Sequence, residues 1–361
     1  MPDRHSDILI IFSPHKIPKL AEVAVVILNW NGVHFLEKFL PPLVEFTDRE
    51  IAEIWVADNG STDASMDLIR QEYPSVKTIE LGENYGFAKG YNRTLDQIDA
   101  PFFVLLNSDV EVTENWLVPL YKAMKKDAGL GACMPKVKSW HDKDSFEHAG
   151  AAGGFLDKFG YPFCRGRIFN RIEKDTGQFD SDLNIFWASG ACLMIRSELY
   201  KRSGGLDPFF FAHMEEIDLC WRIKNLDYRI QFCWRSTIYH IGGGTLPKHD
   251  HKKTYLNFRN NIILLYKNLP ARKLFPILFP RLVLDWISML QFLVKLELRN
   301  FSSVIKAHLF LLGHLRSIRR LRAKNLSLDG LRTHPEMFPG SIVYHFFIKG
   351  NKYYRQLDFN P

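Results

Sequence analysis

The segment Val23-Ala-Val-Val-Ile-Leu-Asn-Trp-Asn-Gly32 joins an uninterrupted apolar run to a polar turn. A strand buried on both faces has this pattern, because neither of its faces meets water. The same change occurs in Ile54-Trp-Val-Ala-Asp-Asn-Gly-Ser-Thr-Asp63, and again where the apolar run Phe102–Leu106 reaches Asn107-Ser-Asp109. Segments of helical periodicity separate the runs, which predicts βαβ units and a parallel sheet.

Further elements are predicted around these segments. Expected helices span residues 33–46, 64–73, 87–98, 197–203 and 215–226, and expected strands add residues 76–81 and 236–240. Residues 139–184 are rich in loop-forming and charged residues and are expected to form an insertion rather than a domain. Polar residues are common in ordinary turns. Several polar clusters at the carboxyl edge of one parallel sheet nevertheless predict a ligand-binding cleft.

Charge is distributed unevenly along the 361 residues. Residues 1–250 contain 28 Lys and Arg against 35 Asp and Glu, whereas residues 251–361 contain 19 against five. A chain of this length corresponds to about two domains. We therefore predict a leader of unclear structure at residues 1–21, an α/β domain at residues 22–249 and a basic, mostly helical region at residues 250–361.

The five cysteines are odd in number and widely spaced along the chain. They form neither a CxxC pair nor a zinc-binding spacing, which is typical of a protein in a reducing compartment. The apolar run at residues 8–12 is too short for a signal peptide. We therefore expect a cytoplasmic protein.

Two carboxylates and one histidine at strand ends are candidates for ligand binding. Asp58 can accept the imide N–H of a uracil or thymine ring, whereas Thr62 and Asp63 can instead cap the following helix. Asp109 is suited to a hard cation such as Mg²⁺ or Mn²⁺, although a simple Asx turn would also explain it. His240 ends an apolar strand before three glycines and is a candidate second metal ligand.

The densest chemical signal is Phe209-Phe-Phe-Ala-His-Met-Glu-Glu-Ile-Asp218, in which three carboxylates follow an aromatic cluster. A general base needs a carboxylate that is partly screened from water and faces a cleft. Acidic residues also stabilise the N-terminus of any helix through its dipole. Glu215, Glu216 and Asp218 are therefore all candidates for the general base.

The order of these motifs resembles family 2 glycosyltransferases of the GT-A fold, most of all their bacterial rhamnosyltransferase-type branch. The likeness covers about residues 22–245. It rests on residues 25–32, 57–63, 84–92, 105–110, 187–192, 204–211, 215–222 and His240. It implies an α/β fold with a Rossmann-like, mostly parallel sheet flanked by helices, followed here by a C-terminal helical extension.

The resemblance also implies roles for individual residues. Asp58 would bind the nucleotide base, and Asp109 and His240 would bind a divalent cation, Mg²⁺ or Mn²⁺. The general base would be Glu216, with Glu215 and Asp218 as rivals because Glu stands where Asp is more common. Asn107 replaces the usual first Asp of the metal motif. The matched motifs extend the donor-binding set to Asn29, Asn31, Asn84, Gly86, Lys89, Asn107 and Ser108.

These roles imply an inverting glycosyltransferase that uses a nucleoside-diphosphate sugar. The acceptor would be a glycan or a lipid-linked molecule in cell-surface polysaccharide or glycolipid assembly, and the branch favours rhamnose as the sugar. A Rossmann oxidoreductase is an alternative, but the first strand does not lead into the GxGxxG loop that cradles phosphates. A non-catalytic membrane-surface binding protein is another alternative.

The C-terminal region carries a pattern typical of proteins that contact membranes. Residues 251–324 contain 15 Lys and Arg but only Asp285 and Glu297 as acids. The apolar stretch 274–294 is interrupted by Arg281 and Asp285, which argues against a membrane span. The basic run 316–324, which includes Arg319, Arg320 and Arg322, favours peripheral contact with an anionic inner-membrane surface. An ordinary helical subdomain is the alternative, and we expect no nucleic-acid partner because no recognition motif is present.

Overall fold

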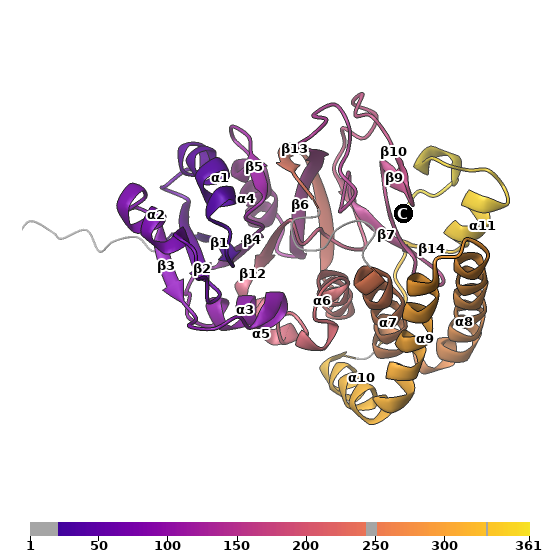
Figure 1. Ribbon diagram of the computed structural model, residues 1–361. Coiled ribbons are helices and arrows are strands. Elements are labelled where there is room, and N and C mark those ends of the chain that lie inside the picture. Colours follow the sequence, from indigo (N-terminus) through magenta and orange to yellow (C-terminus); the bar gives the residue numbers. More distant parts are fainter. Residues whose placement is uncertain (1–20, 243–250, 330) are drawn as a thin grey trace, which may run out of the picture.

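The computed structural model describes residues 21–242, 251–329 and 331–361, so the predicted leader lies almost wholly outside the described residues (Figure 1). Its first four strands confirm the predicted strands and pair in parallel in the order β4-β1-β2-β3. They are β1 (Val23–Asn29), β2 (Ala52–Asp58), β3 (Lys77–Glu80) and β4 (Phe102–Leu106). Strands β1, β2 and β4 are mostly or fully buried, as expected for apolar runs inside a sheet, whereas β3 is an exposed strand at the end of the sheet.

The sheet continues beyond β4 with strands from later in the chain, in the order β11-β13-β6-β12-β4. Strand β12 is antiparallel to both of its neighbours, whereas β13 is parallel to β6. The small strand β5 pairs with the end of β13. These strands are β5 (Val110–Val112), β6 (Leu130–Ser139), β11 (Leu183–Asn184), β12 (Cys192–Arg196) and β13 (Arg229–His240). The result is the predicted Rossmann-like α/β sheet, but it is mixed rather than mostly parallel, because the strands beyond β4 add antiparallel pairs.

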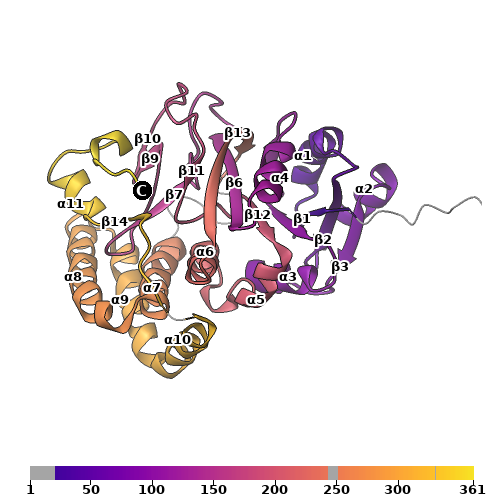
Figure 2. The same cartoon turned by 180° about the vertical axis from the view of Figure 1, so that it is seen from behind.

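Helices cover both faces of this sheet (Figures 1 and 2). One face carries α1 (Val33–Phe46), α2 (Ser65–Glu72) and α4 (Leu117–Lys126). The other carries α3 (Gly86–Leu95), α5 (Ser197–Ser203) and α6 (Glu215–Asn225). Helix α1 buries Leu36, Phe39, Leu40 and Leu43. This spacing places an apolar stripe against the sheet.

Residues 139–184, expected to be an insertion of loops, instead contribute most of a second sheet with the strand order β10-β9-β8-β7-β14. Its strands are β7 (Gly154–Asp157), β8 (Pro162–Cys164), β9 (Arg167–Ile168), β10 (Arg171–Ile172) and β14 (Met337–Phe338). Strands of two to four residues are too short to show alternation in the sequence. Phe163 of this sheet packs against Tyr354 and Phe359 near the C-terminus. The C-terminal segment therefore belongs to the core of the second sheet.

The C-terminal region is mostly helical, as predicted. Its helices are α7 (His251–Asn268), α8 (Ala271–Val294), α9 (Leu298–Gly313), α10 (Leu315–Asp329) and α11 (Ile342–Phe347). Helix α7 packs against α6 on one side and against α8, α9 and α10 on the other. The predicted domain boundary at residues 249 and 250 lies outside the described residues, and the chain on its two sides is in direct contact through α6 and α7.

One cation of the basic run 316–324 does not face solvent. Arg322 is 8% exposed, and its guanidinium donates hydrogen bonds to the carbonyls of Tyr266 and Leu269 at the C-terminal end of α7. It satisfies helix-end carbonyls that have no partner within their own helix. Arg322 is therefore a structural residue, and the expectation that it contributes to a lipid-facing basic surface is wrong.

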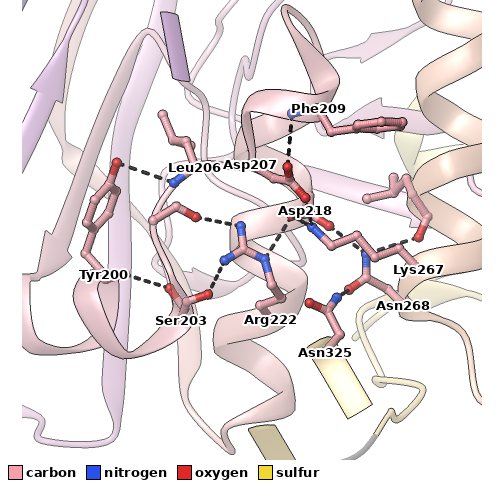
Figure 3. A network of polar contacts seen from close by, with 12 residues as sticks. Tyr200, Ser203, Leu206, Asp207, Phe209, Asp218, Arg222, Lys267, Asn268 and Asn325 are labelled. Atoms are coloured by element: carbon pink, nitrogen blue, oxygen red, sulfur yellow. Dashed lines mark hydrogen bonds and ion pairs between the residues drawn. The ribbon is translucent and has the colours of Figure 1, made fainter. Parts of the chain in front are cut away.

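A buried polar network ties α6 to α7 (Figure 3). The Asp218 carboxylate, which is fully buried, accepts hydrogen bonds from Arg222 at 2.8 Å, Lys267 at 2.7 Å and Asn268 at 2.8 Å. Lys267 also bonds to Asp207, and Asn268 accepts a hydrogen bond from Asn325 of α10. A buried charge is tolerated only where it is paired and hydrogen-bonded in this way.

We expect Lys267→Met to lower the free energy of unfolding by about 3–5 kcal/mol, because it leaves the Asp218 carboxylate buried with one cation fewer. Urea unfolding followed by circular dichroism measures this loss. The matched control is Lys125→Met, which removes a half-exposed ion pair with Glu22 and should cost less than about 1 kcal/mol. Equal effects of the two substitutions would contradict a central role for the network.

Candidate active site

Polar side chains at the ends of β1 and β2 lie side by side. Asn29 and Asp58 are register partners across the β1–β2 ladder, and both are buried. Both Asp58 oxygens accept the backbone N–H of Ser61, and the Asn29 amide donates to Ser61 Oγ at 3.2 Å. A Cβ on Gly32 would lie 2.4 Å from Asn29 Oδ1, so this turn requires glycine. Asn29 Oδ1 has no hydrogen-bond partner among the described residues.

The loops after β1 and β2 hold each other in place. Asn31, which has a φ of 49°, accepts a hydrogen bond from the Thr62 amide at 2.7 Å. Asp63 accepts hydrogen bonds from the Val33 and Ser65 amides at the starts of α1 and α2. Asp63 therefore holds the starts of α1 and α2 together, whereas Asp58 accepts a hydrogen bond within its own loop.

A third segment joins this cluster from the start of α3. Asn59 donates to Asn84 Oδ1 at 3.0 Å, and Asn84 accepts a hydrogen bond from the Gly86 amide. Gly86 has a φ of 72°, a backbone conformation that favours glycine. Lys89 is exposed, and its Nζ lies 4.5 Å from the centre of the Tyr85 ring. Asn84, Gly86 and Lys89 therefore line the rim of the cluster.

The segment after β4 completes this edge of the sheet. The backbone N–H of Asn107 donates to the carbonyl of Ala191, and Ser108 Oγ is 3.8 Å from the position of a Cβ on Gly32. Asp109 is 7% exposed and directly precedes β5. Because β4 pairs with β1, the polar ends of β1, β2 and β4 meet at one edge.

His240 lies in a row between two carboxylates. Its Nε2 is 3.2 Å from Asp109 Oδ1, and its Nδ1 is 3.3 Å from Glu147 Oε2. Burial disfavours a charged imidazole, but the contacts with Asp109 and Glu147 outweigh burial and raise the pKa of His240 to about 10. Burial likewise disfavours charge on Glu147, but His240 and the Ala149 amide lower the pKa of Glu147 to about 2.

Two side chains of this row would suit a divalent cation once the His240 imidazole has lost its proton, but the described residues contain no group of three or more His, Cys, Asp or Glu side chains placed to hold an ion. Asp109 and His240 present a carboxylate oxygen and an imidazole nitrogen 3.2 Å apart, a separation that two ligands of one ion can have. Mn²⁺ accepts both donor types. In that arrangement Glu147 would accept the other ring N–H of His240 and orient the ring, as carboxylates commonly do behind metal-binding histidines. Glu147 is absent from the set inferred from the sequence, because its segment has no recognisable motif.

The first turn of α6 places Glu215 and Glu216 close to the same edge. A Cβ on Gly190 would lie 3.8 Å from Glu216, and Ala191, the next residue, bonds to Asn107. Glu215 Oε2 and Glu216 Oε2 are buried and have no hydrogen-bond partner among the described residues. Burial raises the pKa of Glu216 to about 7. Burial and repulsion from Glu216 raise the pKa of Glu215 well above its ordinary value.

Asp218 differs from the two glutamates. Burial opposes its charge, but Lys267 and Arg222 outweigh burial and lower the pKa of Asp218. Both of its oxygens are engaged by Arg222, Lys267 and Asn268. A carboxylate held as a permanent anion by cations is a poor proton acceptor, so the geometry favours the glutamates over Asp218 as a general base.

The loop before α6 is strained and is held by α7. Phe211, His213 and Met214 have φ values of 66°, 67° and 75°. The Asn260 amide lies within hydrogen-bond distance of three carbonyls of this loop, those of Phe210, Ala212 and His213, at 2.8–2.9 Å. Non-glycine residues adopt such backbone angles only where the surroundings enforce them. Asn260 is also absent from the site residues inferred from the sequence, because the loop that it contacts is almost 50 residues away along the chain.

A mixed α/β sheet with carboxylates, a histidine and a polar cluster at one edge has the organisation expected of the GT-A fold. The family model for glycosyl transferase family 2 matches residues 24–204. The chain belongs to this family and is a glycosyltransferase. The oxidoreductase and the non-catalytic binding protein are thereby excluded as interpretations.

Relatives in the curated collection agree with the predicted branch. An N-acetylglucosaminyl-diphospho-decaprenol L-rhamnosyltransferase of Mycobacterium tuberculosis is 28% identical over 257 residues, which cover 64% of this chain and 82% of that protein. The rhamnosyltransferase WbbL of Escherichia coli K12 is 25% identical over 221 residues, which cover 58% of this chain and 80% of WbbL. Rhamnosyltransferases are therefore among the relatives of this chain, at modest identity.

Two solved glycosyltransferases share the fold. GalNAc-T7, crystallised with UDP, GalNAc and Mn²⁺, matches with a TM-score of 0.54 and 16% sequence identity. The match covers 71% of this chain and 49% of GalNAc-T7. The mannosyltransferase PcManGT from Pyrobaculum calidifontis, in complex with GDP-Man and Mn²⁺, matches with a TM-score of 0.50 and 16% identity over 85% of this chain and 80% of its own length. These likenesses support the GT-A fold.

We expect kcat/KM for sugar transfer to rise with pH through about 7, the value to which burial raises the pKa of Glu216. The acid limb of this profile reports the base of the free enzyme, which must lose its proton to act. Initial rates at low donor concentration and constant Mn²⁺ measure it. An acid limb near the ordinary glutamate pKa of 4.5 would contradict the expectation.

The same titration predicts a change in stability. Because the pKa of Glu216 is higher in the folded than in the unfolded chain, stability is lost as pH rises through the folded-state pKa. Glu216→Gln should therefore unfold at a higher temperature than the parent protein at pH values above about 7, and at a similar temperature in acid. Thermal unfolding at several pH values gives the comparison.

We expect Glu147→Gln to weaken Mn²⁺ binding by about 10- to 100-fold, because His240 loses its anionic partner at Nδ1. Calorimetric titration with Mn²⁺ measures this directly and does not depend on activity. Glu111→Gln is the matched control, because Glu111 lies two residues after Asp109 but bonds to Trp140 and Lys143. Unchanged Mn²⁺ affinity in the Glu147 variant would rule out the orienting role.

Proposed function

We propose that this glycosyltransferase is inverting and moves rhamnose from a nucleoside-diphosphate sugar to an acceptor hydroxyl in the assembly of a cell-surface polysaccharide or glycolipid. The observation that carries the mechanism is the position of Glu216, a half-buried side chain whose Oε2 is buried and has no hydrogen-bond partner among the described residues, close to the edge of the sheet where β2 ends at Asp58 and β4 leads to Asp109. The sugar and the acceptor class are supported by the rhamnosyltransferase relatives.

The nucleotide would lie across the ends of β1 and β2. Asp58 would accept the N–H of the base, and Asn29, Asn31 and Asn84 would line the sugar and base positions around it. Asn107 and Ser108 would face the ribose and diphosphate. At the start of α3, Gly86 would let the backbone come close to the donor, and Lys89 would place a cation at the rim of the site. Both features suit an anionic donor.

Asp109 and His240 would hold a divalent cation, Mg²⁺ or Mn²⁺, which when bound neutralises charge on the diphosphate leaving group. Glu216 would accept the proton of the acceptor hydroxyl as that oxygen attacks the anomeric carbon from the face opposite the leaving group. A single displacement of this kind inverts the configuration. Because the pKa of Glu216 is about 7, its carboxyl group is partly ionised at neutral pH and is a stronger proton acceptor than an ordinary glutamate.

The acceptor side of the reaction is also proposed to involve a membrane. The C-terminal helices expose Arg316, Arg319 and Arg320 and carry few acids. Such a surface is attracted to anionic headgroups, each cation adding about 1 kcal/mol. We propose a peripheral protein at the cytoplasmic face of the inner membrane, where a lipid-linked acceptor is presented.

The decisive substitutions are Asp109→Asn and Glu216→Gln. Asp109→Asn should abolish transfer and remove the Mn²⁺ dependence of donor binding, because a neutral amide is a weak cation ligand. Glu216→Gln should lower kcat by about 10²- to 10⁴-fold with donor affinity little changed, because proton transfer occurs only in the transition state. Thermal-shift assays with UDP-, dTDP- and GDP-sugars, with and without Mn²⁺, identify the donor for these assays.

Glu215→Gln is the matched control for the base. It removes the neighbouring carboxylate and should leave kcat within about tenfold of the parent. Near-normal kcat in Glu216→Gln together with a large loss in Glu215→Gln would transfer the base role to Glu215. Mn²⁺-stimulated transfer in Asp109→Asn would place the cation elsewhere.

A further inference from the structure

The outer face of α8 is apolar and exposed along its length. Its side chains, called here the α8 stripe, are between 54 and 83% exposed: Phe275, Phe279, Trp286, Ile287, Leu290 and Val294. Spacings of three, four and seven residues place them along one side of a helix. The turn into α9 continues this surface with Leu296 and Leu298, which are 81 and 60% exposed. Soluble monomers rarely expose an apolar surface of this extent without a partner for it.

The charges that interrupt α8 in the sequence do not lie on this stripe. Arg281 and Asp285 are 2 and 0% exposed and form an ion pair at 3.0 Å. Asp285 also contacts His308 of α9 at 3.2 Å, and Arg281 donates to Asn261 of α7. These groups face the neighbouring helices. The charged interruption that argues against a membrane span in the sequence is therefore internal to the helical region.

Cations surround the ends of the α8 stripe. Arg272 and Lys273 are exposed at the start of α8, and Lys295 and Arg299 are exposed at the turn into α9. Glu297 is the one exposed acid between residues 271 and 300, and it accepts a hydrogen bond from Asn300. An apolar stripe with cationic ends complements a bilayer that has anionic headgroups and an apolar interior.

The charge pattern disfavours a second copy of the chain as the occupant. A two-fold dimer through this face would bring the same patch of each copy together. The cationic ends of the patch have too few acids to pair with across such an interface, so like charges would face each other. A lipid surface meets both the apolar stripe and its cations with complementary groups.

We infer that the α8 stripe and the α8–α9 turn insert into the interfacial layer of an anionic membrane, with α8 lying in the membrane plane. An amphipathic helix in this position buries its apolar face by about 5–10 Å. Trp286 suits the headgroup boundary, where tryptophan is enriched. The inference deepens the proposed function, on which it rests for the lipid-linked acceptor, and it names the apolar anchor that the basic surface alone does not supply.

The test uses the full chain and flotation with vesicles of phosphatidylcholine, with and without phosphatidylglycerol. The double variant Trp286→Glu/Leu290→Glu should bind phosphatidylglycerol vesicles at least about tenfold more weakly than the parent, because it places two charges on the inserted face. This loss should persist at high salt, which screens the basic surface but not apolar insertion. The matched control is Phe347→Glu/Ile348→Glu at the end of α11, where the two side chains are 57 and 73% exposed.

Equal thermal unfolding midpoints establish that both variants are folded, and transfer to a water-soluble acceptor should be unchanged in both. Equal vesicle binding by the parent and the α8 variant would overturn the inference. A parent protein that does not bind vesicles would also overturn the inference. If that parent sediments as a dimer and the α8 variant as a monomer, the stripe is a dimer interface instead. Failure of the parent to transfer sugar to any acceptor would instead contradict the proposed function and leave the vesicle result standing.

Discussion

The buried carboxylate of Asp218 is the constraint on which the arrangement of the site depends. A carboxylate without exposure to water must be paired, and its partners Lys267 and Asn268 come from α7 rather than from its own helix. This fixes α6 against α7 at a point only two residues beyond Glu216. The unpartnered glutamates at the start of α6 can remain close together because the helix that carries them cannot shift to separate them.

The same helix α7 also supports the loop before α6. Left-handed backbone angles at Phe211, His213 and Met214 each cost about 1–3 kcal/mol. The hydrogen bonds from Asn260 to three carbonyls of this loop offset that cost in the folded state. The loop before α6 and the basic C-terminal region are therefore in direct contact, although a division by charge places them in different parts of the chain.

Local signals explain which features could be predicted from the sequence. The strands β1, β2 and β4 are uninterrupted apolar runs, and their polar ends must meet because neighbouring parallel strands share an edge. The second sheet could not be predicted, because its strands are very short and β14 comes from near the C-terminus. The sequence also cannot show which of Asp218 and Glu216 is paired with a cation. Asp218 is paired with Lys267, which is 49 residues away along the chain.

The direction of a charged side chain decides whether it opposes or permits contact with lipid, and hydropathy along the sequence does not record direction. Arg281 and Asp285 are four residues apart, so they lie on one side of α8 and can pair there while the opposite side stays apolar. Arg322 shows the same effect in reverse, since it belongs to the inner side of α10 with Ile318 and Asn325, all of them buried. A basic run in the sequence therefore contains more cations than the surface exposes. An apolar run interrupted by charges can still form a continuous apolar surface, because the charged side chains can lie on the other side of the helix.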